Sequence, residues 1–90
     1  MIVTVARVTD PDRFLEIFRT LGAETRKEHG CRSAHVYFDP DDAHRVWSVF
    51  DWDDEDYAGF LADPAIPGIA RQLGLQGPPV HAEAAIELDA

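Results

Sequence analysis

Two side chains that could carry acid–base chemistry, His35 and Ser48, fall in two neighbouring runs of strand-forming residues. These runs, at 32–38 and 45–52, flank an Asp-Pro-Asp-Asp segment that is typical of turns, so they predict a β-hairpin. Because histidine titrates near neutral pH, His35 could take a proton from a substrate while Ser48 donates a hydrogen bond. The alternative is a histidine whose ring only completes the hydrogen bonding of a buried sheet.

The register of this hairpin decides which side chains share a face of the sheet. If Phe38 pairs with Arg45, Arg32 lies opposite the oppositely charged Asp51. One face is then apolar and is expected to contact a second copy of the chain; it carries Ala34, Val36, Trp47 and Val49. The other face is expected to line a ligand pocket; it carries Tyr37, Phe50, Trp52 and the directly opposed pair His35 and Ser48. A register shifted by one residue would exchange these partners.

Further elements are predicted on both sides of the hairpin. β-Branched residues favour a strand at the start of the chain, and apolar residues at helical spacing, with Asp10 as N-cap, favour a helix before the hairpin. The predicted ranges are a strand at 1–8, a helix at 12–29, the two hairpin strands, a helix that starts at 53–56 and is bent by two prolines, its second segment at 66–73, and a strand at 80–88. This βαββαβ order predicts one α+β, ferredoxin-like domain over residues 1–90, with a four-stranded antiparallel sheet and two helices on one face.

The composition limits the partners of the chain. A net charge of −9 opposes binding to nucleic acid and to anionic membranes. The single cysteine, Cys31, allows no intrachain disulfide, and a cytoplasmic protein is expected. Neither the dispersed histidines nor the acidic run at 51–56 has the ligand spacing of a metal site, so no metal is expected. Neither hairpin face is of the polar, solvent-facing type and two helices cover only one side, so a homodimer through the other sheet face is expected.

Three segments resemble the antibiotic biosynthesis monooxygenase (ABM) family of dimeric α/β barrels. They are the turn FDPDD, the strand WSVFDW that ends in Trp52, and the helix YAGFLADPAI. The resemblance implies a homodimer whose two sheets pack face to face, with a pocket between each sheet and its own helices. In cofactor-independent members of the family, the pocket positions that match this chain are Ser48, Trp52, Tyr57 and Arg71. Ser48 stands where those members have an amide.

The leading hypothesis is a small-molecule-binding protein that acts as a cofactor-independent monooxygenase on an aromatic or polycyclic, anthrone- or quinol-like substrate with O₂. In this hypothesis His35 is the base, Ser48 and Arg71 donate to the oxyanion that forms, and Trp52 completes the catalytic group. The residues expected to bind the substrate are Tyr37, Phe50, Tyr57 and Phe60. No cofactor is expected.

Each of these roles has a structural alternative. Trp52 and Tyr57 could belong to the core at the junction of strand and helix, as aromatic side chains commonly do. Arg71 could pair with one of the many surface acids. Two other functions also remain open, a non-catalytic dimeric binding or interaction module and an isomerase or cyclase on the same scaffold.

Overall fold

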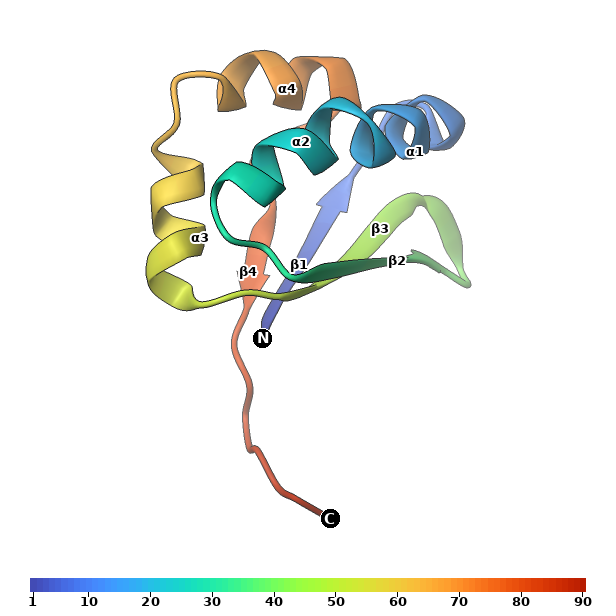
Figure 1. Ribbon diagram of the computed structural model, residues 1–90. Coiled ribbons are helices and arrows are strands. Elements are labelled where there is room, and N and C mark those ends of the chain that lie inside the picture. The colour runs from blue at the N-terminus through green and yellow to red at the C-terminus, as the bar shows by residue number, and fades with distance from the viewer.

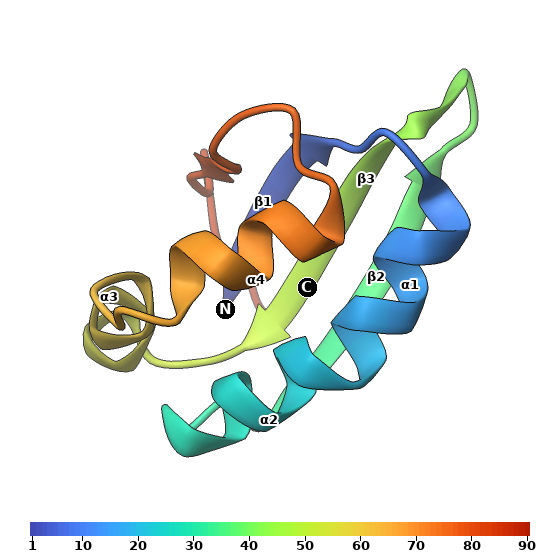
Figure 2. The same cartoon turned by 90° about the horizontal axis from the view of Figure 1, so that it is seen from above.

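The structure, a computed structural model, describes residues 1–90 and contains four strands and four helices. In chain order they are β1 (Ile2–Arg7), α1 (Pro11–Arg19), α2 (Leu21–Glu28), β2 (Ser33–Asp39), β3 (Asp42–Asp51), α3 (Asp54–Leu61), α4 (Ile66–Leu73) and β4 (Val80–Ala82). The strands form one antiparallel sheet in the order β2-β3-β1-β4. Helices α1, α2 and α4 lie over one face, and α3 lies beside the end of the sheet (Figures 1 and 2). The predicted ferredoxin-like α+β fold is confirmed.

The single helix predicted over 12–29 is two helices in the structure. Asp10 caps α1 as predicted, because its carboxylate accepts from the backbone N–H groups of Asp12 and Arg13. Thr20 then leaves the helical conformation, with φ −109° and ψ −92°, and separates α1 from α2. Its hydroxyl donates to the Glu16 carbonyl at 2.7 Å, a local bond that competes with the helical ladder.

The break in the second helical segment falls where the prolines predict it. Helix α3 ends at Leu61, and α4 begins at Ile66 and ends at Gly74, whose φ of 72° provides the left-handed cap. No helix has the length and apolar character needed to cross a membrane.

The last strand is much shorter than predicted. Only Val80–Ala82 pairs with β1, and the remainder of the predicted strand extends away from the sheet toward the C-terminus (Figure 1). Ile86 and Leu88 in this segment are exposed. The apolar residues do alternate, but a strand also needs a partner edge. In this register residue 84 would already lie opposite Met1, so residues 85–88 extend beyond the end of β1.

The predicted hairpin register is wrong by one residue. In the structure His35 pairs with Val49, and Ser48 pairs with Val36. Strand β3 begins as early as Asp42, and a bulge interrupts β2 between Phe38 and Asp39, so the connection is shorter than the predicted turn.

The charge pair used to argue the predicted register nevertheless exists. Arg32 lies 3.0 Å from Asp51, but it precedes β2, and it also reaches Asp53 at 3.0 Å. A long arginine side chain can reach a diagonal partner, so this ion pair could not fix the register.

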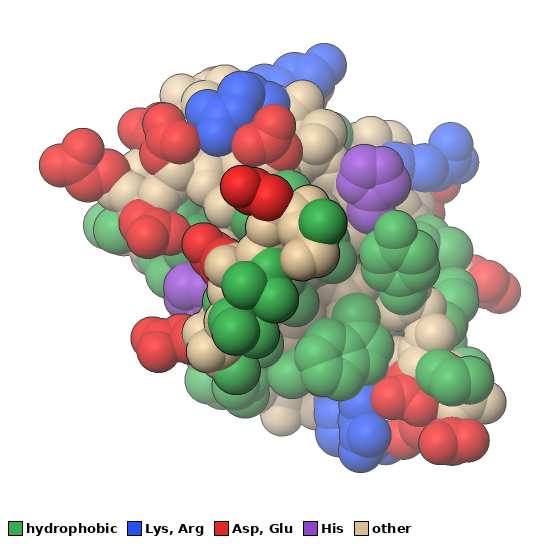
Figure 3. All heavy atoms as spheres, turned by 90° about the horizontal axis from the view of Figure 1, so that it is seen from below, with side chains coloured by type: hydrophobic (Ala, Val, Ile, Leu, Met, Phe, Trp, Pro, Cys, Tyr) green, Lys and Arg blue, Asp and Glu red, His purple; other side chains and the backbone are tan.

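The sheet therefore has two contrasting faces. On the side of the helices, sheet and helix residues form a buried core of two clusters. One contains Ile2, Phe50, Trp52 and Tyr57, and the other contains Val8, Phe14 and Val46. The opposite side, here called the open face, is formed by Val3, Val5, His35, Tyr37, Trp47, Val49 and Val80. No element covers it, and hydrophobic side chains gather there between charged ones (Figure 3).

Candidate functional site

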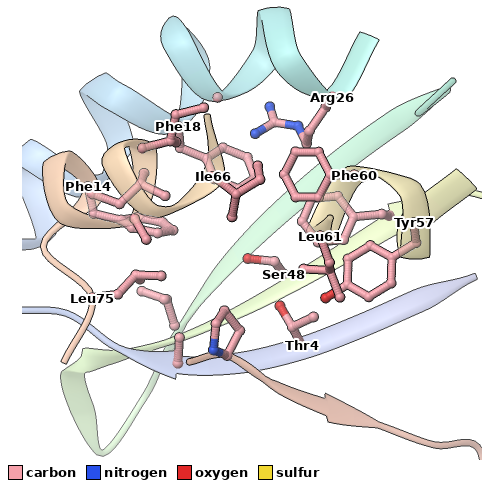
Figure 4. A pocket seen from close by; sticks show the side chains of 18 residues that line it. Thr4, Phe14, Phe18, Arg26, Ser48, Tyr57, Phe60, Leu61, Ile66 and Leu75 are labelled. Atoms are coloured by element: carbon pink, nitrogen blue, oxygen red, sulfur yellow. The ribbon is translucent and has the colours of Figure 1, made fainter. Parts of the chain in front are cut away.

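A cavity of about 120 Å³ lies between the sheet and its helices (Figure 4). Its walls are mainly aliphatic and aromatic side chains. Helix α1 contributes Phe14 and Phe18, α3 contributes Tyr57 and Phe60, and α4 contributes Ile66, Ile69, Ala70 and Leu73. The non-helical connection between α3 and α4 leaves room beside the cavity that a continuous helix would fill.

The floor of the cavity is the helix-facing side of the two central strands. Because side chains alternate along a strand, Thr4 of β1 and Ser48 of β3, which are register partners, both face the helices. Both residues are largely buried. Neither hydroxyl makes a side-chain hydrogen bond, and since no fully buried side-chain oxygen lacks a partner, both hydroxyls are accessible from the cavity. These hydroxyls are polar groups available to a bound molecule.

Tyr57 closes one end of the cavity. Burial raises the pKa of its phenol, so the hydroxyl stays protonated at neutral pH. Its ring packs edge-on against Trp52 at 5.3 Å and against His81 at 5.7 Å. The pairing of His81 with Thr4 puts His81 on the helix-facing side of the sheet, where it is exposed and contacts Tyr57 but does not line the cavity.

The strongest charge in the cavity wall is Arg26 of α2. Only 8% of this residue is exposed, and its guanidinium carbon lies 3.9 Å from the centroid of the Phe18 ring and 5.9 Å from that of Phe50. Burial lowers its pKa, and Cys31 is the only ionisable neighbour that opposes this effect. No carboxylate lies within ion-pair distance of it.

The structure brings Ser48, Phe50, Tyr57 and Phe60 of the predicted site together in the cavity wall. Trp52 is adjacent but does not line the cavity: it is 1% exposed and donates from Nε1 to the His29 carbonyl at 2.8 Å. Its ring packs against Phe60 at 4.8 Å, so it supports the cavity wall from behind.

The other predicted site residues lie elsewhere. His35 and Tyr37 are on the open face, because the one-residue register shift turns both side chains away from the helices. The predicted contact between His35 and Ser48 is therefore wrong. Arg71 is exposed and is not part of the cavity wall.

Sequence analysis missed Arg26, although the signal was present. Phe14, Phe18, Gly22 and Arg26 follow one another at intervals of four residues, which places them in one row along a helical surface. A charged residue continuing an apolar row indicates a buried or cavity-facing group.

The fold and the cavity together define a ferredoxin-like α+β domain with an internal, mainly apolar pocket. The sequence profile of the antibiotic biosynthesis monooxygenase (ABM) family matches residues 2–63, and the chain belongs to this family. None of the proteins with curated descriptions matches it.

Two solved structures share the fold. One is a mutant of SnoaB, a cofactor-independent oxygenase from Streptomyces nogalater, with a TM-score of 0.71, 18% identity, and coverage of 99% of this chain and 95% of SnoaB. The other is a conserved protein from Methanosarcina mazei Go1, with a TM-score of 0.64, 21% identity, and coverage of 90% of this chain and 85% of that protein. At these identities the similarity establishes the architecture.

Proposed function

We propose that this chain is a cofactor-independent monooxygenase that oxidises a small aromatic, quinol-like molecule with O₂ inside the cavity. The observation that carries the proposal is the mainly apolar cavity, with the hydroxyl groups of Thr4 and Ser48 in its wall, in a chain of the ABM family. The cofactor-independent oxygenase SnoaB has the same fold, which supports the proposal. A mainly apolar site with a few polar groups is the usual form of a small-molecule pocket.

The cavity volume favours a substrate with one ring. An enclosed cavity of roughly 150 Å³ is known to hold one benzene molecule, and the cavity here is slightly smaller, about 120 Å³. A tricyclic anthrone would need α3 or α4 to move outward. We therefore narrow the predicted substrate class to one-ring quinols.

The proposed reaction replaces one ring C–H by a carbonyl oxygen. A phenolic proton leaves, and the resulting electron-rich ring carbon adds O₂ to give a hydroperoxide. Loss of water from the hydroperoxide yields the quinone, so that one oxygen atom stays on the ring and the other leaves in water with the two hydrogens that the substrate loses. In this scheme Ser48 donates a hydrogen bond to the phenolate oxygen, and His81 beside Tyr57 accepts the proton because His35 faces away.

We propose further that the protein works as a homodimer through the open face. Trp47 and Val49 are only half-buried there, and Tyr37 and Val80 are 57% and 63% exposed. Contiguous apolar surface of this kind marks an interaction site. A second copy is the partner expected for a self-complementary sheet face in this family.

The proposed reaction is tested by supplying ¹⁸O₂ with methylhydroquinone as substrate. Monooxygenation gives a hydroxylated quinone with one added ¹⁸O atom, whereas simple autoxidation gives unlabelled quinone and peroxide. Ala70→Leu fills the cavity from α4 and should remove labelling, and Ala58→Leu on the exposed side of α3 is the matched control. Absence of enzyme-dependent label across one-ring quinols would reject the monooxygenase proposal.

The second candidate is a binding module without catalysis. It is favoured by the position of His35, the predicted base, on the open face rather than in the cavity. In that case quinols bind and are blocked by Ala70→Leu, but no ¹⁸O appears in the product. An isomerase or cyclase would use the same base without O₂, and no observation favours it.

A further inference from the structure

We propose that Arg26 is the anion-binding group of the cavity and that the physiological ligand is a one-ring aromatic carboxylate. This inference rests on the proposed function only in that the cavity binds an aromatic molecule. It adds a full negative charge to that molecule and names the residue that recognises it.

Arg26 differs from the other arginines in its surroundings. All six other arginines are exposed. Those at 7, 19, 32 and 45 each pair with a carboxylate within 4 Å, whereas Arg13 and Arg71 have no such partner but are exposed to solvent. Arg26 is the buried one, yet it has no acidic partner in a chain with 17 acidic residues. An unpaired buried charge costs several kcal/mol, so a charge held in this way calls for a counter-ion from outside the chain.

The guanidinium is also held in a fixed orientation. Stacking at 3.9 Å from the centre of the Phe18 ring covers one of its two planar faces, and Figure 4 shows the group reaching from α2 toward the interior of the cavity. A stacked guanidinium keeps the N–H groups along its edges free. Those edges match the two oxygens of a carboxylate, which is the geometry of a bidentate pair.

A glycine at position 22 makes room for this orientation. A Cβ atom at Gly22 would lie 3.0 Å from Nη1 of Arg26 and 3.3 Å from the Ile17 carbonyl oxygen. Gly22 is the second residue of α2, and its backbone conformation does not require glycine, since only Gly30, Gly74 and Gly77 have positive φ. The absence of a side chain at position 22 leaves space for Arg26 to fold back toward the cavity.

The rest of the cavity sets the size and polarity of the ligand. Its volume of about 120 Å³ admits one ring, and its remaining wall is mainly apolar. The hydroxyls of Thr4 and Ser48 lie on the sheet, across the cavity from α2 (Figure 4). A ligand with a carboxylate on one side of the ring and a phenolic oxygen on the other satisfies both groups.

The test compares benzoate with its neutral isostere benzamide, both titrated into the protein and measured by NMR chemical-shift changes. A charge-assisted hydrogen-bonded pair contributes about 1.5–3 kcal/mol, which corresponds to a preference for benzoate of roughly 10- to 100-fold. Arg26→Gln should remove that preference while changing the benzamide affinity by less than about twofold. Arg19→Gln makes the same charge change on the exposed side of α1 and should leave both affinities unchanged.

Gly22→Ala provides a second variant that keeps the charge. The added methyl group would lie 3.0 Å from Nη1 of Arg26 and shift the guanidinium by a few tenths of an ångström, so benzoate should bind more weakly than to the wild type while the benzamide affinity stays the same. This variant keeps the test valid if Arg26→Gln fails to fold.

Three results would overturn the inference: equal affinities for the two probes, an equal loss for both in Arg26→Gln, or no binding of either probe. The first two would make Arg26 a packing residue. Failure of the monooxygenase proposal has a different signature, because benzoate would then still bind through Arg26 while no ¹⁸O enters methylhydroquinone. Conversely, labelled product without a preference for benzoate would remove this inference alone.

Discussion

The two faces of the sheet come from the same four strands, whose side chains alternate between them. The faces differ in the kind of group that lacks a partner. The helix-facing side is covered, and within its cavity Ser48 and Arg26 are polar groups without partners. The open face has the reverse arrangement, with apolar side chains such as Trp47 and Val49 that no element covers. An unpaired polar group inside an apolar cavity favours a small ligand, whereas an uncovered apolar surface favours another protein surface.

The two tryptophans allow the faces to be compared by stability. Trp52→Ala should lower the free energy of unfolding by about 3–5 kcal/mol, because it removes a buried ring packed against Phe50, Tyr57 and Phe60. Trp47→Ala, measured by urea unfolding at a concentration where the protein is monomeric, should cost much less. Similar losses for the two variants would contradict the assignment of Trp52 to the core and of Trp47 to the uncovered side.

A charge placed on the open face should break the proposed dimer. Val49 lies in the centre of that face, paired with Val3 of β1 and His35 of β2. Val49→Asp would bury two unpaired carboxylates in each dimer and should raise the dissociation constant at least about 100-fold. Sedimentation equilibrium measures this, with Ala58→Asp on α3 as the control of equal charge. A wild-type monomer at micromolar concentration, or a Val49→Asp dimer of unchanged affinity, would show that the open face is not the interface.

A pH-dependent hydrogen bond joins two of the segments that cover the helix-facing side of the sheet. His29 at the end of α2 lies 2.8 Å from Asp63 between α3 and α4, and this hydrogen bond, with a second from the Ala65 backbone, lowers the pKa of Asp63. The ionised carboxylate therefore stabilises the fold above its unfolded pKa of about 4, and this contribution disappears as the pH falls through the lower folded value.

Asp63→Asn should accordingly be less stable than the wild type at pH 7, and the difference should be smaller at pH 3, which is below the unfolded pKa of about 4. Urea unfolding at the two pH values measures it. A difference that persisted undiminished at low pH would show that Asp63 contributes through packing rather than through its charge. The effect of Asp63→Asn should be smaller than those of Trp52→Ala and Val49→Asp, because Asp63 lies near the surface.

The comparison of faces also shows what the sequence could and could not predict. Alternation within β3 was sufficient to place Ser48 and Phe50 on one side and Trp47 and Val49 on the other, because period two leaves no freedom within a strand. The fold followed in the same way from the order of strand and helix patterns. Caps such as Asp10 and Gly74 act locally and were predictable.

The relation between strands was harder to predict. Strand β2 alternates apolar Ala34, Val36 and Phe38 with Ser33, His35 and Tyr37, and this pattern favours the observed register, in which Ala34 and Val36 pack against the core. The charge pair of Arg32 with Asp51 favoured the other register, but it is a diagonal contact. His35 and Tyr37 were misplaced for this reason. Arg26 was missed because a cation in an apolar row gains significance only once the cavity beneath the helices is known.

The two indole N–H signals in a ¹⁵N–¹H NMR spectrum test the central claim most directly, since Trp52 backs the cavity wall and Trp47 lies on the open face. Anaerobic addition of methylhydroquinone should shift the Trp52 signal and leave Trp47 in place, while dilution from dimer to monomer should shift Trp47 and leave Trp52 in place. A ligand that shifts Trp47 instead, or dilution that shifts Trp52 alone, would contradict the division of the sheet into a ligand-binding face and a dimer-forming face.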